Sequence, residues 1–156
     1  MAREITLTAG TATLTFAADP AATDTVTIGD ITYTFIATPA AAYDVDVAGT
    51  RAGSIANLVA AINRSGTPGA TTYHANTVAN PYVTAVDNGD DTVTLTARVK
   101  GLSGVTTTTS ETDITFGAAT LSGTGCLADF LDDLVDYNQL RSEVIHEIVH
   151  ACSEAA

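Results

Sequence analysis

The chain has 156 residues, of which 18 are acidic and six are basic, so its formal net charge is −12. Because the basic residues are scattered and phosphate backbones require clustered positive charge, nucleic acid is not an expected partner. No segment reaches the roughly 20 apolar residues of a membrane span, and the first residues lack the apolar run of a signal peptide. We therefore expect synthesis in a cytoplasm without export, and no contact with membranes.

Most of residues 1–123 follow strand patterns, in which Thr alternates with apolar residues. The clearest pattern is a hairpin, because a two-residue turn at 29–30 places Ile28 opposite Ile31 and Val26 opposite Tyr33. All four side chains then lie on one face, and Thr residues occupy the other face. Further strands are predicted at residues 12–16, 43–47, 82–86, 92–99 and 113–116.

One helix interrupts the strands. Four apolar residues recur there at helical spacing: Ile55, Leu58, Val59 and Ile62. They predict an amphipathic helix near residues 52–64, terminated by residues 66–68. The expected fold is therefore α+β, with a mainly antiparallel, sandwich-like sheet, one packed helix and a C-terminal amphipathic helical tail.

The segment 87–91 reads Asp-Asn-Gly-Asp-Asp and offers enough oxygen atoms to suggest a Ca²⁺ site. It lacks the ligand spacing and the distal Glu of an EF-hand loop. A tight acidic turn between the strands at 82–86 and 92–99 explains the same residues. We expect a turn here and no bound cofactor.

Five segments in this order resemble a known family. They are residues 12–16 (ATLTF), 24–35 (DTVTIGDITYTF), 54–63 (SIANLVAAIN), 79–85 (ANPYVTA) and 91–97 (DTVTLTA). Together they look like a module found in structural proteins of tailed bacteriophages, including capsid decoration and tail-associated proteins. The resemblance covers roughly residues 10–123, implies a virion component and supplies no catalytic residues. It favours residues 1–123 as one β-rich virion module, with residues 124–156 as a separate helical tail.

The tail carries two apolar sets at helical spacing. They are Leu127, Phe130, Leu131 and Leu134, followed by Ile145, Ile148, Val149 and Cys152. The sets lie 18 residues apart, about five helical turns, so a single helix keeps both on one face. A helical hairpin with Asp136 as N-cap is the alternative. We expect this apolar stripe to contact a partner subunit; packing onto the chain's own sheet is the other possibility.

The same tail contains His146-Glu147-Ile148-Val149-His150, which fits the H-E-x-x-H motif of zinc metallopeptidases. Both imidazoles would share one helix face, and Glu154 is the nearest candidate for a third ligand. On one straight helix, however, the three side chains would spread along the axis, about 6 Å apart per step, rather than surround a metal. We therefore expect no enzyme and no resident metal, with a zinc peptidase as a minor alternative.

Cys126 and Cys152 distinguish the two forms of the tail. In a single helix they would lie about 39 Å apart, whereas a disulfide requires Cα atoms within about 7 Å. They could then pair only between subunits, although a helical hairpin would bring them together. Two reduced, buried thiols are the other reading.

These observations predict a non-enzymatic virion protein, most simply a homo-oligomeric capsid decoration protein that clamps neighbouring subunits of the major capsid protein. A tail or fibre module that binds a receptor is the alternative.

Overall fold

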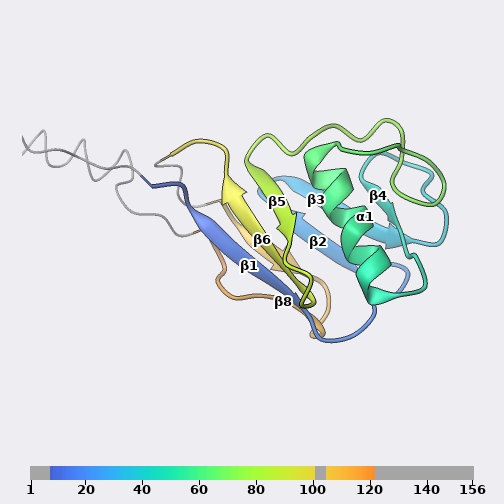
Figure 1. Cartoon of the computed structure of the whole chain (residues 1–156), viewed down its shortest axis with the longest axis horizontal. Coiled ribbons are helices and arrows are strands. Elements are labelled where there is room, and N and C mark those ends of the chain that lie inside the picture. The colour runs from blue at the N-terminus through green and yellow to red at the C-terminus, as the bar shows by residue number, and fades with distance from the viewer. Residues whose placement is uncertain (1–7, 101–104, 122–156) are drawn as a thin grey trace, which may run out of the picture.

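The computed structural model describes residues 8–100 and 105–121 (Figure 1). Eight strands and one helix follow one another in this part of the chain: β1 Thr11–Phe16, β2 Thr25–Ile28, β3 Ile31–Ile36, β4 Asp44–Asp46, α1 Arg51–Asn63, β5 Val83–Asp87, β6 Thr92–Ala97, β7 Thr107–Thr109 and β8 Ile114–Phe116. The predicted α+β class, rich in antiparallel strands and with one helix, is confirmed for these residues. The predicted tail at 124–156 lies outside them.

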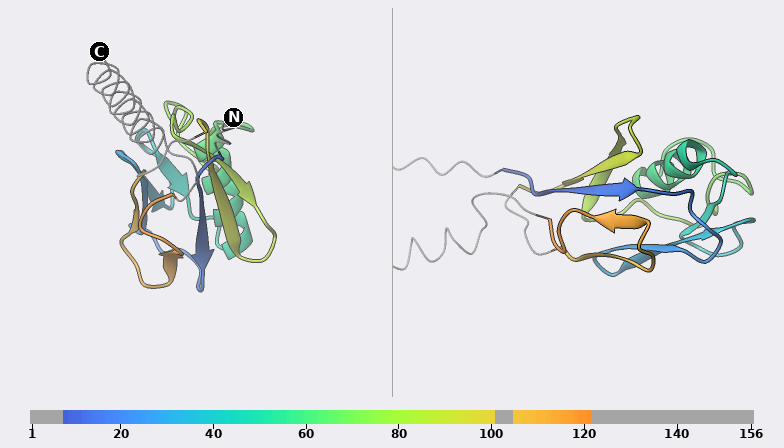
Figure 2. Two further views of the ribbon diagram at one scale, coloured as in Figure 1. Left: turned by 90° about the vertical axis from the view of Figure 1, so that its left-hand side faces the viewer. Right: turned by 90° about the horizontal axis from the view of Figure 1, so that it is seen from below.

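The strands form two four-stranded sheets, in the orders β5-β6-β1-β8 and β4-β3-β2-β7 (Figure 2). All pairings are antiparallel except that of β3 with β4, which is parallel. The consecutive strands β7 and β8 belong to different sheets, so the chain crosses from one sheet to the other between residues 109 and 114. Sequence patterning missed β7, because its run of Thr residues lacks the apolar alternation that marks the other strands.

The β2–β3 hairpin has the predicted register, with Ile28 opposite Ile31 and Val26 opposite Tyr33. Gly29 in its turn has φ +66°, in the left-handed region where glycine is favoured. A Cβ at this position would also lie 2.6 Å from Cε2 of Tyr82, so both conformation and space require glycine here.

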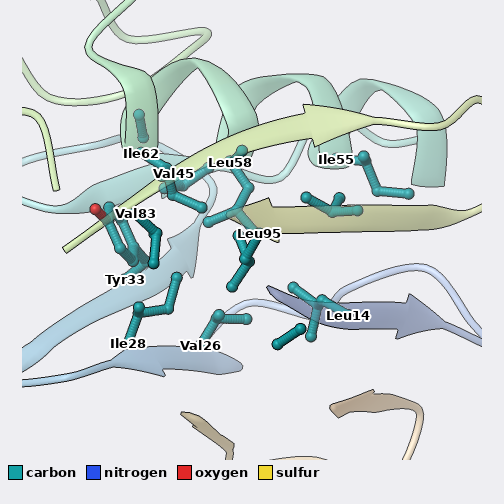
Figure 3. Packing of buried hydrophobic residues seen from close by; sticks show 14 of the residues in the cluster. Leu14, Val26, Ile28, Tyr33, Val45, Ile55, Leu58, Ile62, Val83 and Leu95 are labelled. Atoms are coloured by element: carbon teal, nitrogen blue, oxygen red, sulfur yellow. The ribbon is translucent and has the colours of Figure 1, made fainter. Parts of the chain in front are cut away.

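Alternation along the strands builds one core from both sheets and the helix (Figure 3). Its largest fully buried side chains are Tyr33, Tyr73, Phe16, Phe35, Leu14, Ile28, Ile55, Leu58, Ile62, Leu95, Ile114 and Leu121. Phe16 and Phe35 meet edge to face across the two sheets, with ring centroids 6.3 Å apart. One prediction is wrong here: β6 ends at Ala97, and Val99, expected to continue its apolar side, is 60% exposed.

Helix α1 begins after Thr50, whose side chain accepts a hydrogen bond from the backbone N–H of Gly53. It ends at Asn63, within one residue of the predicted end near residue 64. Arg64 adopts the left-handed conformation (φ 55°), and its N–H bonds back to the carbonyls of Ala60 and Ala61. The Arg64 guanidinium lies 5.6 Å from the centre of the Tyr73 ring. This contact helps to stabilise a backbone conformation that is unfavourable for residues other than glycine.

The outer edge of β5 is closed by side-chain amides. Asn63, the last residue of α1, donates from Nδ2 to the carbonyl of Ala85 at 2.7 Å and accepts from its N–H at 2.9 Å. Asn80 Oδ1 accepts from the N–H of Val83 at 3.1 Å. Two asparagines thus take the places that a further strand would fill.

The edge strands of the second sheet also have backbone partners. On β4, the N–H of Asp46 donates to Thr72 and the carbonyl of Asp44 accepts from His74. On β7, the N–H of Thr107 donates to the carbonyl of Ala119. These edges are therefore occupied within the chain and are closed to strand addition at these groups.

Both ends of the described chain emerge at the same end of the domain (Figures 1 and 2). Backbone hydrogen bonds join Ala97 to Gly10 and Leu121 to Val105 there. The turn at residues 87–91 lies at the other end of strand β1, where its last residue, Phe16, donates its N–H to the carbonyl of Asp91.

Candidate interaction surface

The outer face of the β5-β6-β1-β8 sheet is covered by threonines, and we call it the threonine face. Its members are Thr11, Thr13, Thr15, Thr84, Thr92, Thr94, Thr96 and Thr115, all exposed or partly exposed. They stand in cross-strand rows, since Thr11 lies opposite Thr96 and Thr13 opposite Thr94. Each position presents a methyl group and a hydroxyl group at a strand spacing of about 4.8 Å.

The threonine face is electrically neutral in a strongly acidic protein. Its strands place no charged side chain on this side, and Val86, which is 58% exposed, is its large apolar member. The carboxylates lie instead in the turns and at strand ends, including Asp19, Asp90 and Asp113. The negative charges are therefore kept apart from the threonine face.

The carboxylates of the turn at 87–91 are committed to protein donors. Asp87 Oδ1 accepts from the N–H of Gly89 at 2.9 Å, and Asp90 Oδ1 accepts from the hydroxyl of Thr92 at 2.5 Å. Asp91 accepts from Arg51 Nη1 at 2.9 Å. These bonds are those of a tight acidic turn. Among the described residues, no group of three potential metal-ligating side chains occurs.

Arg51 joins three segments at this end of the domain. Besides Asp91, its Nη1 donates to the carbonyl of Phe16 at 3.0 Å, and its Nε lies 3.5 Å from a carboxylate oxygen of Asp19. The first turn of α1 is thereby fastened to the end of β1 and to the turn between β5 and β6. This cation has a structural role.

A polar network crosses the interior between the sheets. Asn80 is fully buried; its Nδ2 donates to the hydroxyl of Tyr33 at 3.4 Å, and its backbone carbonyl accepts from Arg98 Nε at 2.7 Å. Desolvation by burial raises the pKa of Tyr33 to about 12, against a smaller lowering by the bond to Asn80. The phenol therefore stays neutral as part of the core.

On the surface, a hydrogen bond from Tyr82 to Asp30 raises the pKa of the Tyr82 phenol. The one described histidine, His74, accepts the backbone N–H of Asn76 at its Nδ1. These contacts also tie side chains to local backbone or neighbouring turns.

The residues predicted as functional in the tail lie outside the described residues. They are the apolar stripe (Leu127, Phe130, Leu131, Leu134, Ile145, Ile148, Val149), the zinc candidates (His146, His150, Glu154) and the cysteines Cys126 and Cys152. Conversely, the sequence patterns give no indication of the contacts made by Arg51, Asn63 or Asn80. A signal for the threonine face was present in the alternation at 11–15 and 92–96.

Neither a protein-family model nor a curated protein matches the chain. Within the described residues, no helix has the length and apolar character needed to cross a bilayer.

Proposed function

We propose that the protein is a non-enzymatic structural component of a tailed-phage virion, which decorates a capsid as a homo-oligomer and clamps subunits of the major capsid protein. The observation that carries this proposal is the neutral threonine face on a chain of net charge −12. Two copies of a strongly acidic protein repel each other, and a face without charge lets them approach at the lowest electrostatic cost. The resemblance of residues 10–123 to phage virion modules supports the same role.

The edges closed at β4, β5 and β7 indicate how contacts on those sides would form. Because Asn63 occupies the backbone groups of Ala85 and segment 118–121 bonds β7, neighbours would meet side chain to side chain rather than by adding strands. A partner protein would therefore lie against a face of the domain.

The size of the threonine face requires a second contact. Four strands of up to six residues cover roughly 400 Å², from strand spacings of about 4.8 Å and rises of about 3.3 Å. A standard specific interface covers about 800 Å² on each partner. The proposed source of the remainder is the apolar stripe predicted from Leu127 to Val149.

The test is the native molar mass by light scattering after size exclusion, with and without reductant. We expect an oligomer, and a covalent link that reductant removes if Cys126 or Cys152 pairs between subunits. Thr13→Glu places a charge in the threonine face and should reduce association, whereas Thr108→Glu, on the outer face of the other sheet, should not. A monomer under both conditions would contradict the oligomer, and equal effects of the two variants would remove the threonine face from the proposal.

A further inference from the structure

Asn88 and Gly89 form a reactive pair in the turn between β5 and β6. Asn88 is the one asparagine in the 156-residue sequence that is followed by glycine. Gly89 has φ +76°, so the turn favours glycine at this position. The absence of a side chain on residue 89 leaves its backbone nitrogen unhindered for attack on the carboxamide of the preceding Asn88.

We propose that Asn88 is a modification site that deamidates spontaneously, and that the hydroxyls of Thr92 and Thr94 hold the rate down in the folded protein. In this reaction the backbone nitrogen of Gly89 loses its proton and attacks Cγ of Asn88. The new C–N bond closes a succinimide ring, the bond between Cγ and the side-chain nitrogen breaks, and that nitrogen takes up the proton and leaves as ammonia. Water then opens the ring at either carbonyl and gives aspartate or isoaspartate, with no change of oxidation state.

The folded structure restrains the carboxamide that must react. Asn88 Nδ2 donates to Thr92 Oγ1 at 2.8 Å and to Thr94 Oγ1 at 3.0 Å, and its Oδ1 accepts from Thr94 Oγ1 at 3.3 Å. These bonds draw the side chain across the hairpin toward β6. Ring closure requires the carboxamide to turn away from them and face its own chain.

The attacking nitrogen is restrained as well. The N–H of Gly89 donates to Asp87 Oδ1 at 2.9 Å, and the backbone N–H of Asn88 bonds the carbonyl of Thr92 at 3.0 Å. The reaction thus needs a local opening of the turn. Asn88 itself is exposed, so water reaches the succinimide once it forms.

Conversion changes the surface at a defined place. The product carboxylate adds a negative charge beside Asp87, Asp90 and Asp91, and it loses the two donors that Asn88 gives to Thr92 and Thr94. The new charge lies at the border of the neutral threonine face. Weaker self-association of the aged protein would follow, and this consequence alone rests on the proposed function.

The experiment follows deamidation during storage of the full-length protein in mildly alkaline buffer. Peptide mapping by mass spectrometry in heavy-oxygen water locates each converted asparagine, because ring opening incorporates the label. We expect label at residue 88 ahead of every other asparagine. Thr92→Val with Thr94→Val should raise the rate about thirtyfold, the effect of losing the two hydrogen bonds that Asn88 Nδ2 donates, at ordinary net strength.

Thr13→Val with Thr96→Val is the matched control, since these threonines share the face but make no bond to Asn88. Its rate should equal that of the wild type. Thr94→Val alone should give an intermediate rate, and it serves if the double variant fails to fold by circular dichroism. The proposal would be overturned if the variants at Thr92 and Thr94 deamidated at the wild-type rate. It would also be overturned if another asparagine were labelled earlier, or if no variant were labelled at all. Its outcome is independent of the oligomeric state; Asn88→Asp in the light-scattering assay tests the consequence for association.

Discussion

Replacing Asn63 by alanine should open the edge of β5 and lower the free energy of unfolding by about 3 kcal/mol. The substitution removes both partners of Ala85, which is 3% exposed, so one N–H and one carbonyl lose their hydrogen bonds in the interior. An unpaired buried group costs about 1–3 kcal/mol. Two such groups would cost about 2–6 kcal/mol together. Asn63 is itself partly exposed, so water recovers part of the loss, and the expected value lies in the lower half of that range.

The assay is guanidinium unfolding followed by far-ultraviolet circular dichroism, with the slope fitted separately for each variant. Asn63→Asp is a sharper variant of the same size, because its carboxylate still accepts from the N–H of Ala85 but turns an oxygen toward the Ala85 carbonyl. It should be at least as unstable as the alanine variant. Asn76→Ala, at an exposed loop position, is the control and should change stability by less than about 0.5 kcal/mol. If Asn63→Ala matched this control, the closed edge would contribute nothing to stability and the reasoning would be refuted.

Three further predictions concern single side chains. Arg51→Ala should lower the free energy of unfolding, measured in urea, by about 1–2 kcal/mol, because the bonds to Phe16 and Asp91 are lost from a partly exposed side chain. Unchanged stability would show that water replaces these bonds. Thr23→Gly should raise the unfolding midpoint and increase the free energy of unfolding by about 1 kcal/mol, since Thr23 has φ 84°, which is unfavourable for a β-branched residue. A lower midpoint would contradict this account. The pKa of Tyr33 is raised from 10.0 to about 12 in the folded protein. The stability that the neutral phenol contributes is therefore complete below pH 10 and is lost as pH rises toward 12, by about 3 kcal/mol in all. Tyr33→Phe should remove this decline from stability curves measured against pH, and a decline that persists in the variant would assign it to other groups.

The hairpin register was predictable because two signals agree in it. The two-residue turn fixes the pairing, and alternation fixes which side chains face the core, so Val26 and Tyr33 lie where the sequence places them. The helix was predictable for the same reason, through the spacing of Ile55, Leu58 and Ile62. Local patterns are sufficient where the chain packs against its near neighbours.

The contacts that close the domain could not be predicted in this way. Asn63 reaches Ala85 across 22 residues, and Arg51 reaches Asp91 across 40. Such pairs depend on how the elements pack in space, and an asparagine or arginine in a sequence does not disclose its distant partner. Strand β7 was missed because its run of threonines lacks apolar alternation, and its pairing with β2, distant in the chain, adds no hairpin signal. The threonine face needed the order of the strands, since alternation alone does not show which strands lie side by side.

The shared exit of residues 8 and 121 at one end of the domain makes these residues a natural unit for transplantation. A domain whose two ends emerge together can be spliced into a surface loop of a host protein without stretching either part. The turn at 87–91 would then lie at the other end of β1, β5 and β6 from the splice point. A peptide grafted into that turn would be held away from the splice point by the length of these strands.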